Sequence, residues 1–239
     1  MTSWIAFEPY KIKVRPDVRI IISREKGFCS GVQRAVSTAE TVLQKSGVVA
    51  ATDVLLHNAQ EANRLREAGL RSVEELGEDE LSSATILLPA HGSTQAERDA
   101  RVTRAHAVID LVCPIVEHAH TAAAELADTG LPVVIVGDRG HRETRYLMEA
   151  AGRHFLDIVS SPDDLPESRE FPMLLGLIFQ TTQSREFRTY VLSWMHNHRI
   201  EVVERFTLCP EVLRRQDCAA CLVGRCTAVL VLGDASSAN

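Results

Sequence analysis

Three cysteines in this sequence stand where an apolar, strand-like run gives way to a helical pattern. Cys29 is flanked by Gly27 and Gly31, whereas Cys113 and Cys209 are each followed directly by proline. Proline is favoured in the first turn of a helix, so we expect each cysteine between a strand end and a helix N-terminus. Free N–H groups and the helix dipole lower the pKa of a thiol there and favour the metal-binding thiolate. We therefore predict that three thiolates meet at one centre; the alternative is three separate buried thiols.

Polar side chains follow other apolar runs in the same way. They are His57, His91, His141, Glu143, Thr181 and Ser237. In parallel α/β sheets, ligands bind outside the carboxyl ends of the strands, so these side chains are candidates for a binding site. A carboxylic acid near a histidine and a hydroxyl is able to relay protons, and protonated histidines donate charge-assisted hydrogen bonds to anions. For Glu143 the alternative is a solvated acid in the first turn of a helix, where acids are favoured in any case.

The length and composition are typical of a globular protein. The chain has 239 residues, of which 45% are hydrophobic, and a formal net charge of −6. This charge, without a dense patch of Lys and Arg, argues against nucleic-acid binding. The apolar runs are too short to span a membrane, and the N-terminus lacks the pattern of a signal peptide, so we expect a cytoplasmic protein without a membrane partner. Cysteines in such a protein are expected as metal ligands or buried thiols rather than disulfides.

Apolar runs and helical patterns alternate along the chain. The predicted strands are 18–22, 50–57, 85–89, 107–112, 132–136, 172–179, 200–208 and 227–232. Continuous apolar runs that alternate with helices are typical of parallel sheets in an α/β fold. Thr94 and Glu97 have the spacing of a capping box, which predicts a helix that continues to Ala105.

Seven fragments of the sequence, taken in order, resemble the 4-hydroxy-3-methylbut-2-enyl diphosphate reductase family (IspH/LytB). They are Gly-Phe-Cys-Ser-Gly-Val-Gln-Arg-Ala-Val at 27–36, His57-Asn58, Pro-Ala-His-Gly at 89–92, Cys113-Pro114, Gly-His-Arg-Glu at 140–143, Gln-Thr-Thr at 180–182, and the segment from Cys209 to Gln216. The resemblance extends from about Ile20 to Asn239. It implies an iron–sulfur oxidoreductase of isoprenoid biosynthesis. Such an enzyme removes the allylic hydroxyl of 4-hydroxy-3-methylbut-2-enyl diphosphate and forms isopentenyl and dimethylallyl diphosphates.

The resemblance also implies a role for each candidate residue. Cys29, Cys113 and Cys209 would bind a [4Fe–4S] cluster that keeps one iron open. The implied diphosphate ligands are His57, His91, His141, Ser237 and Asn239. The implied catalytic residues are Glu143 for proton delivery, Thr181 for the substrate hydroxyl, and His141. The implied partners are the small-molecule substrate and an electron donor such as ferredoxin or flavodoxin.

The implied architecture is an α/β fold with three small αβ modules, built on parallel sheets around a central iron–sulfur site. We predict an N-terminal extension at 1–18, module 1 at 30–112, module 2 at 113–208, and a third, shortened module at 19–29 plus 209–239. The segment 233–239 departs from the family pattern because it introduces Asp234 and has alanine at 238. Two alternatives therefore stay open. One is a relative that uses the same cluster on a different, non-diphosphate substrate, and the other is a non-catalytic sensor or subunit that carries the cluster.

A second group of cysteines follows near the end of the chain. Cys218 and Cys221 are one helical turn apart, and Cys226 follows them. We interpret this group as small core-packing residues, with a zinc site as the alternative. The histidines outside the strand ends are expected on the surface or in the core with their hydrogen bonds satisfied.

Overall fold

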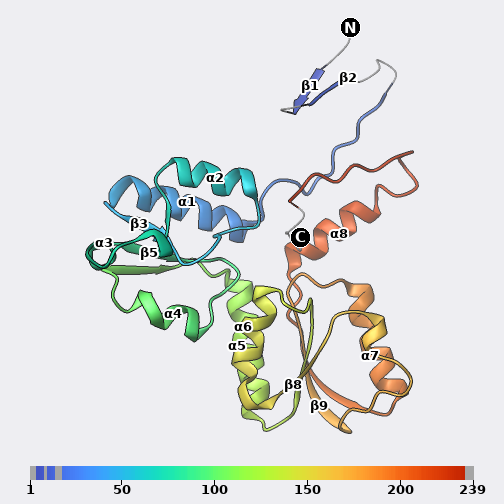
Figure 1. Cartoon of the computed structure of the whole chain (residues 1–239). Coiled ribbons are helices and arrows are strands. Elements are labelled where there is room, and N and C mark those ends of the chain that lie inside the picture. Colours follow the sequence, from blue (N-terminus) through green and yellow to red (C-terminus); the bar gives the residue numbers. More distant parts are fainter. Residues whose placement is uncertain (1–3, 8–9, 14–17, 235–239) are drawn as a thin grey trace.

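Strands and helices alternate along almost the whole chain (Figure 1). The computed structural model describes residues 4–7, 10–13 and 18–234, and the side chains of 18–98 and 102–234. The strands are β1 (Trp4–Phe7), β2 (Tyr10–Lys13), β3 (Val49–Ala51), β4 (Arg71–Ser72), β5 (Thr85–Leu88), β6 (Ala107–Asp110), β7 (Val133–Val136), β8 (Phe155–Val159), β9 (Leu174–Phe179) and β10 (Glu201–Arg205). The helices are α1 (Ser30–Lys45), α2 (Ala59–Glu67), α3 (Glu78–Ser83), α4 (Gln95–Val102), α5 (Pro114–Asp128), α6 (Arg142–Ala151), α7 (Arg185–Asn197) and α8 (Pro210–Ala220).

Most of the strands form two parallel sheets. The first sheet has the order β4-β3-β5-β6, and the second has the order β10-β9-β7-β8. All neighbours within these two sheets are parallel. The strands β1 and β2 form a separate antiparallel pair. The predicted α/β class with parallel sheets is therefore confirmed.

Helix α1 packs on the first sheet through small and β-branched side chains. Ala35, Ala39 and Val42 are buried in one cluster with Leu87 of β5. These side chains recur at helical spacing, as the apolar pattern of 32–43 predicts. The helix that begins with Cys29 is thereby fixed against the sheet.

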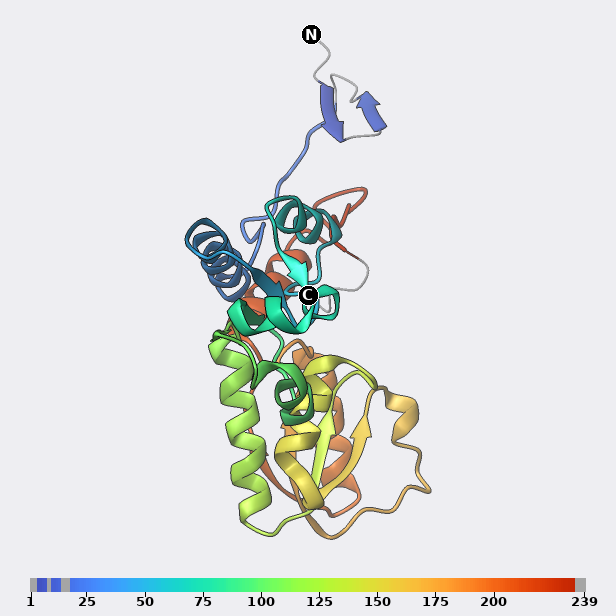
Figure 2. The ribbon, with the colours of Figure 1, turned by 60° about the vertical axis from the view of Figure 1, so that its left-hand side comes forward.

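The second sheet is covered on both faces. Leu126 of α5 and Leu147 of α6 belong to one buried cluster, and Val191 of α7 and Leu213 of α8 belong to another. Figure 2 shows α5 as the long green helix that runs beside this sheet. Because α8 packs here through Leu213, the cysteine at its N-terminus is held at one end of the second sheet.

Each sheet has an interior point at which the strand order reverses. In the first sheet the chain leaves β3 for β4 on one side and leaves β5 for β6 on the other. In the second sheet β7 leads to β8, and β9 leads to β10 in the opposite direction. Open α/β sheets bind ligands outside the strand ends at such switch points. The loops after β3, β5, β7 and β9 are therefore the places to look for a site.

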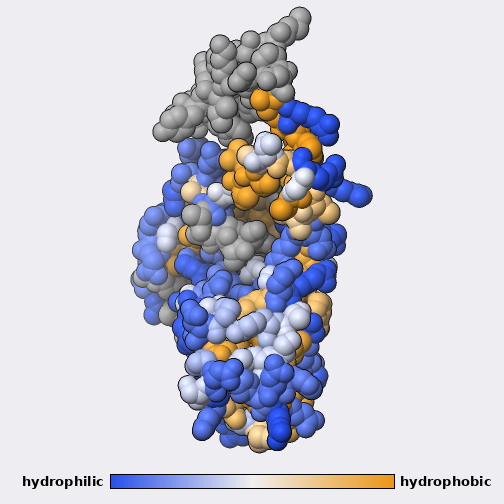
Figure 3. Space-filling model, turned by 90° about the vertical axis from the view of Figure 1, so that its right-hand side faces the viewer, coloured by the Kyte–Doolittle hydropathy of each residue, from blue (hydrophilic) through white to orange (hydrophobic). Residues whose placement is uncertain are grey.

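Two predicted strands, 18–22 and 227–232, are wrong. Both segments lack a strand assignment, and no strand of the described chain pairs with them. Their apolar side chains are exposed: Ile22 by 72% and Val231 by 84%. Hydrophobic side chains gather on the face of the molecule along which these segments run (Figure 3). A strand needs a neighbouring edge to satisfy its backbone hydrogen bonds, so an apolar run without such an edge stays irregular.

Smaller differences have local causes. The predicted strand 50–57 is shorter, because the chain turns away after β3 and places Leu55 and Leu56 in the core beside α1. The helix that the capping box opens ends at Val102 rather than Ala105. The edge strand β8 was not predicted, since Asp157 interrupts its apolar run.

The boundaries of the three modules stay a prediction. None of the helices in the described part of the chain has the length and apolar content needed to cross a bilayer.

Candidate functional site

The cysteines at 29, 113 and 209 occupy the N-cap positions of three different helices. They precede α1, α5 and α8, and all three have extended backbone dihedral angles. The side chains of Cys29 and Cys113 make no capping hydrogen bond to their own helices. The thiols of Cys29 and Cys113 are therefore left available for another partner.

Cys29, Cys113 and Cys209 lie close together. A Cβ atom placed on Gly31 would lie 2.7 Å from Sγ of Cys113 and 3.9 Å from Sγ of Cys29. The thiol of Cys209 is close enough to both other cysteines for their charges to act on it. Gly31 is thus required by the close approach of the Cys113 sulfur, and the structure brings together the three cysteines that the sequence spaces far apart.

The electrostatic environment of Cys209 differs from the prediction. Burial raises the pKa of the Cys209 thiol, although hydrogen bonds from the backbone of Val212 and Glu211 oppose the shift. The expected lowering by the helix N-terminus is therefore wrong for this residue. Desolvation disfavours the thiolate, and two neighbouring thiols add repulsion between like charges.

Backbone hydrogen bonds join two of the cysteines to the strand-end loops. The N–H of Cys113 donates to the carbonyl of Ala90 at 2.9 Å, next to His91. The N–H of Cys209 donates to the carbonyl of Thr181 at 2.8 Å. The thiols and the polar strand-end residues therefore belong to one connected site.

Three histidines form a group at the junction of the two sheets. The rings of His57 and His91 stack with a centroid separation of 5.2 Å, and those of His57 and His141 lie 5.7 Å apart. His57 and His91 follow β3 and β5 at the switch point of the first sheet, while His141 follows β7 of the second. An ion pair between Arg142 and Asp53 joins the loop after β7 to the loop after β3. The histidines meet because the switch points of the two sheets face each other.

The Nε2 atoms of all three histidines are buried without a hydrogen-bond partner among the described residues. In His141 the Nδ1 atom accepts a hydrogen bond from the Glu143 N–H at 3.2 Å. A neutral ring with an accepting Nδ1 carries its proton on Nε2, so Nε2 of His141 is a free donor. Buried polar atoms rarely remain unpaired, and three such atoms from adjacent loops indicate a polar ligand.

Burial also sets the protonation of this histidine group. Desolvation lowers the pKa of His91 to about 3, and the neighbouring His57 and His141 add repulsion. Burial is also the main cause that lowers the pKa of His141. Without a ligand, both rings are therefore neutral near pH 7. A nearby anion would favour the protonated rings and reverse these shifts.

Glu143 lies at the switch point of the second sheet and is buried, with 2% of its surface exposed. Its carboxylate accepts hydrogen bonds from the Thr181 N–H at 2.6 Å and from the Thr181 hydroxyl at 2.9 Å. Burial raises the pKa of Glu143 to about 7, although the bonds from Thr181 oppose the shift. The alternative of a solvated acid is wrong. Residues of this kind, with a pKa near neutrality, are suited to proton transfer.

Gln180 is a site residue for which the sequence analysis predicted no role. It is fully buried, and its side-chain oxygen accepts hydrogen bonds from the Asp138 N–H at 2.7 Å and the Thr144 hydroxyl at 3.3 Å. Its side-chain nitrogen donates to Thr182 at 3.0 Å. Gln180 thereby connects the loops after β7 and β9. Its place at a strand end, next to Thr181, was the signal available in the sequence.

The segment that ends at Asp234 approaches the same site. Ser237 and Asn239 lie outside the described residues, so their predicted role stays a prediction. The carboxylate of Asp234 accepts a hydrogen bond from the Ala59 N–H at 2.9 Å, in the first turn of α2. The N-cap of that helix is Asn58, next to His57. The last described residue therefore lies beside the loop that carries His57.

The interpretation of Cys218, Cys221 and Cys226 as core residues is wrong. Cys221 is exposed, and the other two are only half-buried. The buried residues of α8 are Val212 and Leu213, so the end of this helix extends past the part that packs on the sheet.

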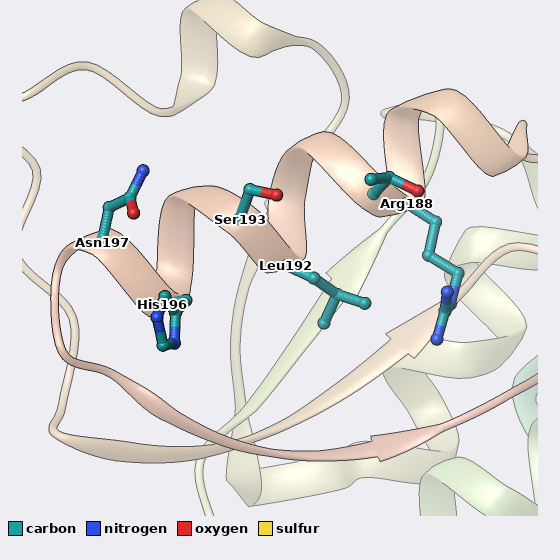
Figure 4. Close-up of a pocket in the computed structure, with 6 residues that line it drawn as sticks. Arg188, Leu192, Ser193, His196 and Asn197 are labelled. Atoms are coloured by element: carbon teal, nitrogen blue, oxygen red, sulfur yellow. The ribbon is translucent and has the colours of Figure 1, made fainter.

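Two surface hollows lie apart from these residues. One of about 340 Å³ is lined by six residues of α7 alone, and Figure 4 shows them along one side of that helix. The other, of about 370 Å³, lies among α4, α5 and α6 beside Tyr146 and His120. Neither hollow contains the cysteines or the histidine group.

The sequence matches the model of a known family. This model, described as LytB protein, matches residues 20–239. The 4-hydroxy-3-methylbut-2-enyl diphosphate reductase of Aquifex aeolicus (strain VF5) is 32% identical over 227 residues, which are 93% of this chain and 77% of the relative. The protein of the same name from Dehalococcoides mccartyi (strain ATCC BAA-2266 / KCTC 15142 / 195) is 32% identical over 217 residues, with 89% and 75% covered.

Solved structures are also similar. An (E)-4-hydroxy-3-methyl-but-2-enyl diphosphate reductase, described as the terminal enzyme of the non-mevalonate pathway, aligns with a TM-score of 0.69 at 32% identity and covers 86% of this chain and 73% of its own. The E-1-hydroxy-2-methyl-but-2-enyl-4-diphosphate reductase of Plasmodium falciparum aligns with a TM-score of 0.77 at 25% identity, with 90% and 68% covered. On its sequence and on its fold, this chain belongs to the LytB protein family.

Proposed function

We propose that this protein is a 4-hydroxy-3-methylbut-2-enyl diphosphate reductase. It removes the allylic hydroxyl of its substrate and yields isopentenyl and dimethylallyl diphosphates. The printed functions of the relatives support this reaction. The observation that carries the proposal is that three thiols at helix N-cap positions, three unpaired histidine nitrogens and one buried acid lie in connected loops.

We propose Cys29, Cys113 and Cys209 as the ligands of a [4Fe–4S] cluster. The donor set fits such a group, because thiolates are the usual ligands of iron–sulfur clusters. Among the residues with described side chains, no three His, Cys, Asp or Glu residues are grouped closely enough for one metal ion. Held by the three cysteines, the cluster would supply electron transfer and a Lewis-acidic iron.

The histidine group is the proposed binding site for the diphosphate. The Nε2 atoms of His57, His91 and His141 lack partners and come from neighbouring loops. Because the rings are buried, their charge-assisted bonds to phosphate oxygens would be strong, at roughly 1.5–3 kcal/mol each. Ser237 and Asn239 are proposed as further, neutral donors to the same group.

Glu143 is the proposed proton donor, and Thr181 orients it. Loss of the allylic hydroxyl as water requires a proton on the leaving oxygen. The pKa of about 7 keeps a large share of Glu143 protonated at neutral pH, where an ordinary glutamate is ionised. The Thr181 hydroxyl, 2.9 Å from the carboxylate, is the proposed path between this acid and the substrate hydroxyl. His141, whose ring accepts a bond from the Glu143 backbone, fixes the start of the same helix.

The reaction consumes two electrons, which the proposed cluster would transfer but not generate, so an external electron donor is needed. We propose a ferredoxin or flavodoxin as this donor, and the cytoplasm as the location.

The test is anaerobic turnover. The purified protein is reconstituted with iron and sulfide and then given 4-hydroxy-3-methylbut-2-enyl diphosphate with a strong one-electron reductant. Formation of isopentenyl and dimethylallyl diphosphates supports the proposal. A protein that binds a cluster but yields neither product contradicts the substrate assignment and favours a relative with another substrate.

A further inference from the structure

The charged residues at the start of α8 hold the segment that carries Cys29. The carboxylate of Glu211 accepts hydrogen bonds from the Ser30 backbone N–H, at 3.2 and 3.1 Å to its two oxygens, and from the Ser30 hydroxyl. Further along the same helix, Arg214 lies 3.8 Å from the carboxylate of Glu25. Ser30 directly follows Cys29, and Glu211 stands two residues after Cys209. The surroundings of two proposed ligands are therefore joined by direct bonds.

Helix α1 is also bonded to the third cysteine. Arg34 donates hydrogen bonds to the carbonyl of Leu111 at 2.9 Å and to the carbonyl of Val112. These two residues directly precede Cys113. Ser30 and Arg34 are four residues apart and so lie on one face of α1. This face of α1 therefore bonds directly to the segments that carry Cys209 and Cys113, and no ligand is needed for these bonds.

We propose that Glu211 is a positioning residue for the cluster. It holds Cys29 beside Cys209 before the cluster is inserted, and its negative charge lowers the reduction potential of the bound cluster. This inference rests on the proposed three-cysteine cluster.

Two physical arguments support it. The Ser30 N–H is one of the free donors at the N-terminus of α1, and a carboxylate is the acceptor that such a position favours most. A fixed negative charge close to the cluster disfavours an added electron, since net charge and hydrogen bonding near the cluster set its potential. Position and charge are separable by substitution, because an amide retains an accepting oxygen but carries no charge.

Three variants make this separation. Glu211→Gln keeps the size of the side chain and one acceptor for Ser30, whereas Glu211→Ala removes both the contact and the charge. The matched control is Glu186→Gln. Glu186 is the second residue of α7, as Glu211 is of α8, but it is exposed and makes no hydrogen bond or ion pair with residues of the described chain.

The first measurement uses the apoprotein. Hydrogen exchange, followed by mass spectrometry on the peptide that spans residues 28–36, reports on the start of α1. We expect Glu211→Ala to exchange about tenfold faster in this peptide, and Glu211→Gln and Glu186→Gln to match the wild type. Unchanged exchange in Glu211→Ala would overturn the positioning role.

The second measurement is a redox titration of the reconstituted protein. We expect Glu211→Gln to bind as much iron and sulfide as the wild type and to be reduced at a more positive potential. A tenfold change in the one-electron equilibrium corresponds to about 59 mV. A potential equal to that of Glu186→Gln would overturn the charge effect. A wild-type protein that takes up no iron would overturn the proposed function and the charge effect together, while the exchange measurement would still decide the positioning role.

Discussion

Thr181 donates both its backbone N–H and its hydroxyl to the carboxylate of Glu143, at 2.6 and 2.9 Å. The two residues follow adjacent strands, β7 and β9, at the point where the order of the second sheet reverses. Two hydrogen bonds from one residue fix the orientation of a buried acid. The same topology in the first sheet brings His57 and His91 together. The site residues are thus brought together by the reversal of strand order in each of the two sheets.

The role of Glu143 is tested by Glu143→Gln. The amide retains an acceptor for Thr181 but has no acidic proton, so we expect turnover to fall by about 10²–10⁴, the usual contribution of a positioned acid. The absorption spectrum of the reconstituted cluster should be unchanged. Full activity in this variant would remove Glu143 from the proton path.

The pH profile of turnover gives a second test of the same group. The pKa of Glu143 is raised to about 7, so the protonated, donating form is lost as the pH rises through that value. We therefore expect kcat to fall about tenfold per pH unit above pH 7 and to level off below it. The measurement is the rate at saturating substrate between pH 5.5 and about 9. A rate that rises across this range would show that the acid form is not required.

The burial of His91 predicts a stability change in acid. The pKa of His91 in the folded state, about 3, is below the ordinary value of 6.5. Between these two pH values, His91 is protonated in the unfolded state but stays neutral in the folded state. Its contribution to stability is therefore present above pH 6.5 and is lost as the pH falls toward 3. Urea unfolding of the apoprotein should lose less stability between pH 6.5 and about 4 in His91→Gln, by about 1–3 kcal/mol. An identical pH dependence in both proteins would mean that His91 titrates normally.

Gly31 gives a steric test of the cysteine site. In Gly31→Ala the new Cβ would meet Sγ of Cys113 at 2.7 Å, so that cysteine must move. We expect the iron content to fall severalfold and the unfolding free energy of the apoprotein to drop by about 1–3 kcal/mol, as overpacking does. Gly47→Ala is the control, because a Cβ there meets nothing within 4 Å. Equal iron contents in the two variants would show that the Cys113 sulfur does not need this space.

The α/β class and most strand positions followed from the sequence, because fully buried parallel strands are continuous apolar runs. Pro132 to Val136 shows this most clearly, since all four residues of β7 are buried. The capping box of Thr94 and Glu97 was also confirmed, with both hydrogen bonds formed. The segments 18–22 and 227–232 are also apolar runs, but no strand of the described chain lies beside them. The composition of a segment does not reveal whether another strand is available to pair with it.

The candidate site residues were found from their place at strand ends, which is a local signal. The contacts that orient them are not local. Glu211 reaches Ser30 across 181 positions, and Gln180 reaches Asp138 across 42. The burial that sets the pKa of Glu143 also comes from packing of distant segments. Such long-range relationships depend on the assembled sheets, so no pattern of spacing predicts them.

The most direct test of the account is the iron and sulfide content of the protein and its cysteine variants after anaerobic reconstitution. We expect roughly four irons and four sulfides per wild-type chain. Each of Cys29→Ser, Cys113→Ser and Cys209→Ser should lose most of this content, whereas Cys221→Ser should keep it. Full iron content in any of the first three variants, or a wild-type chain without iron, would contradict the claim that these three thiols share one cluster.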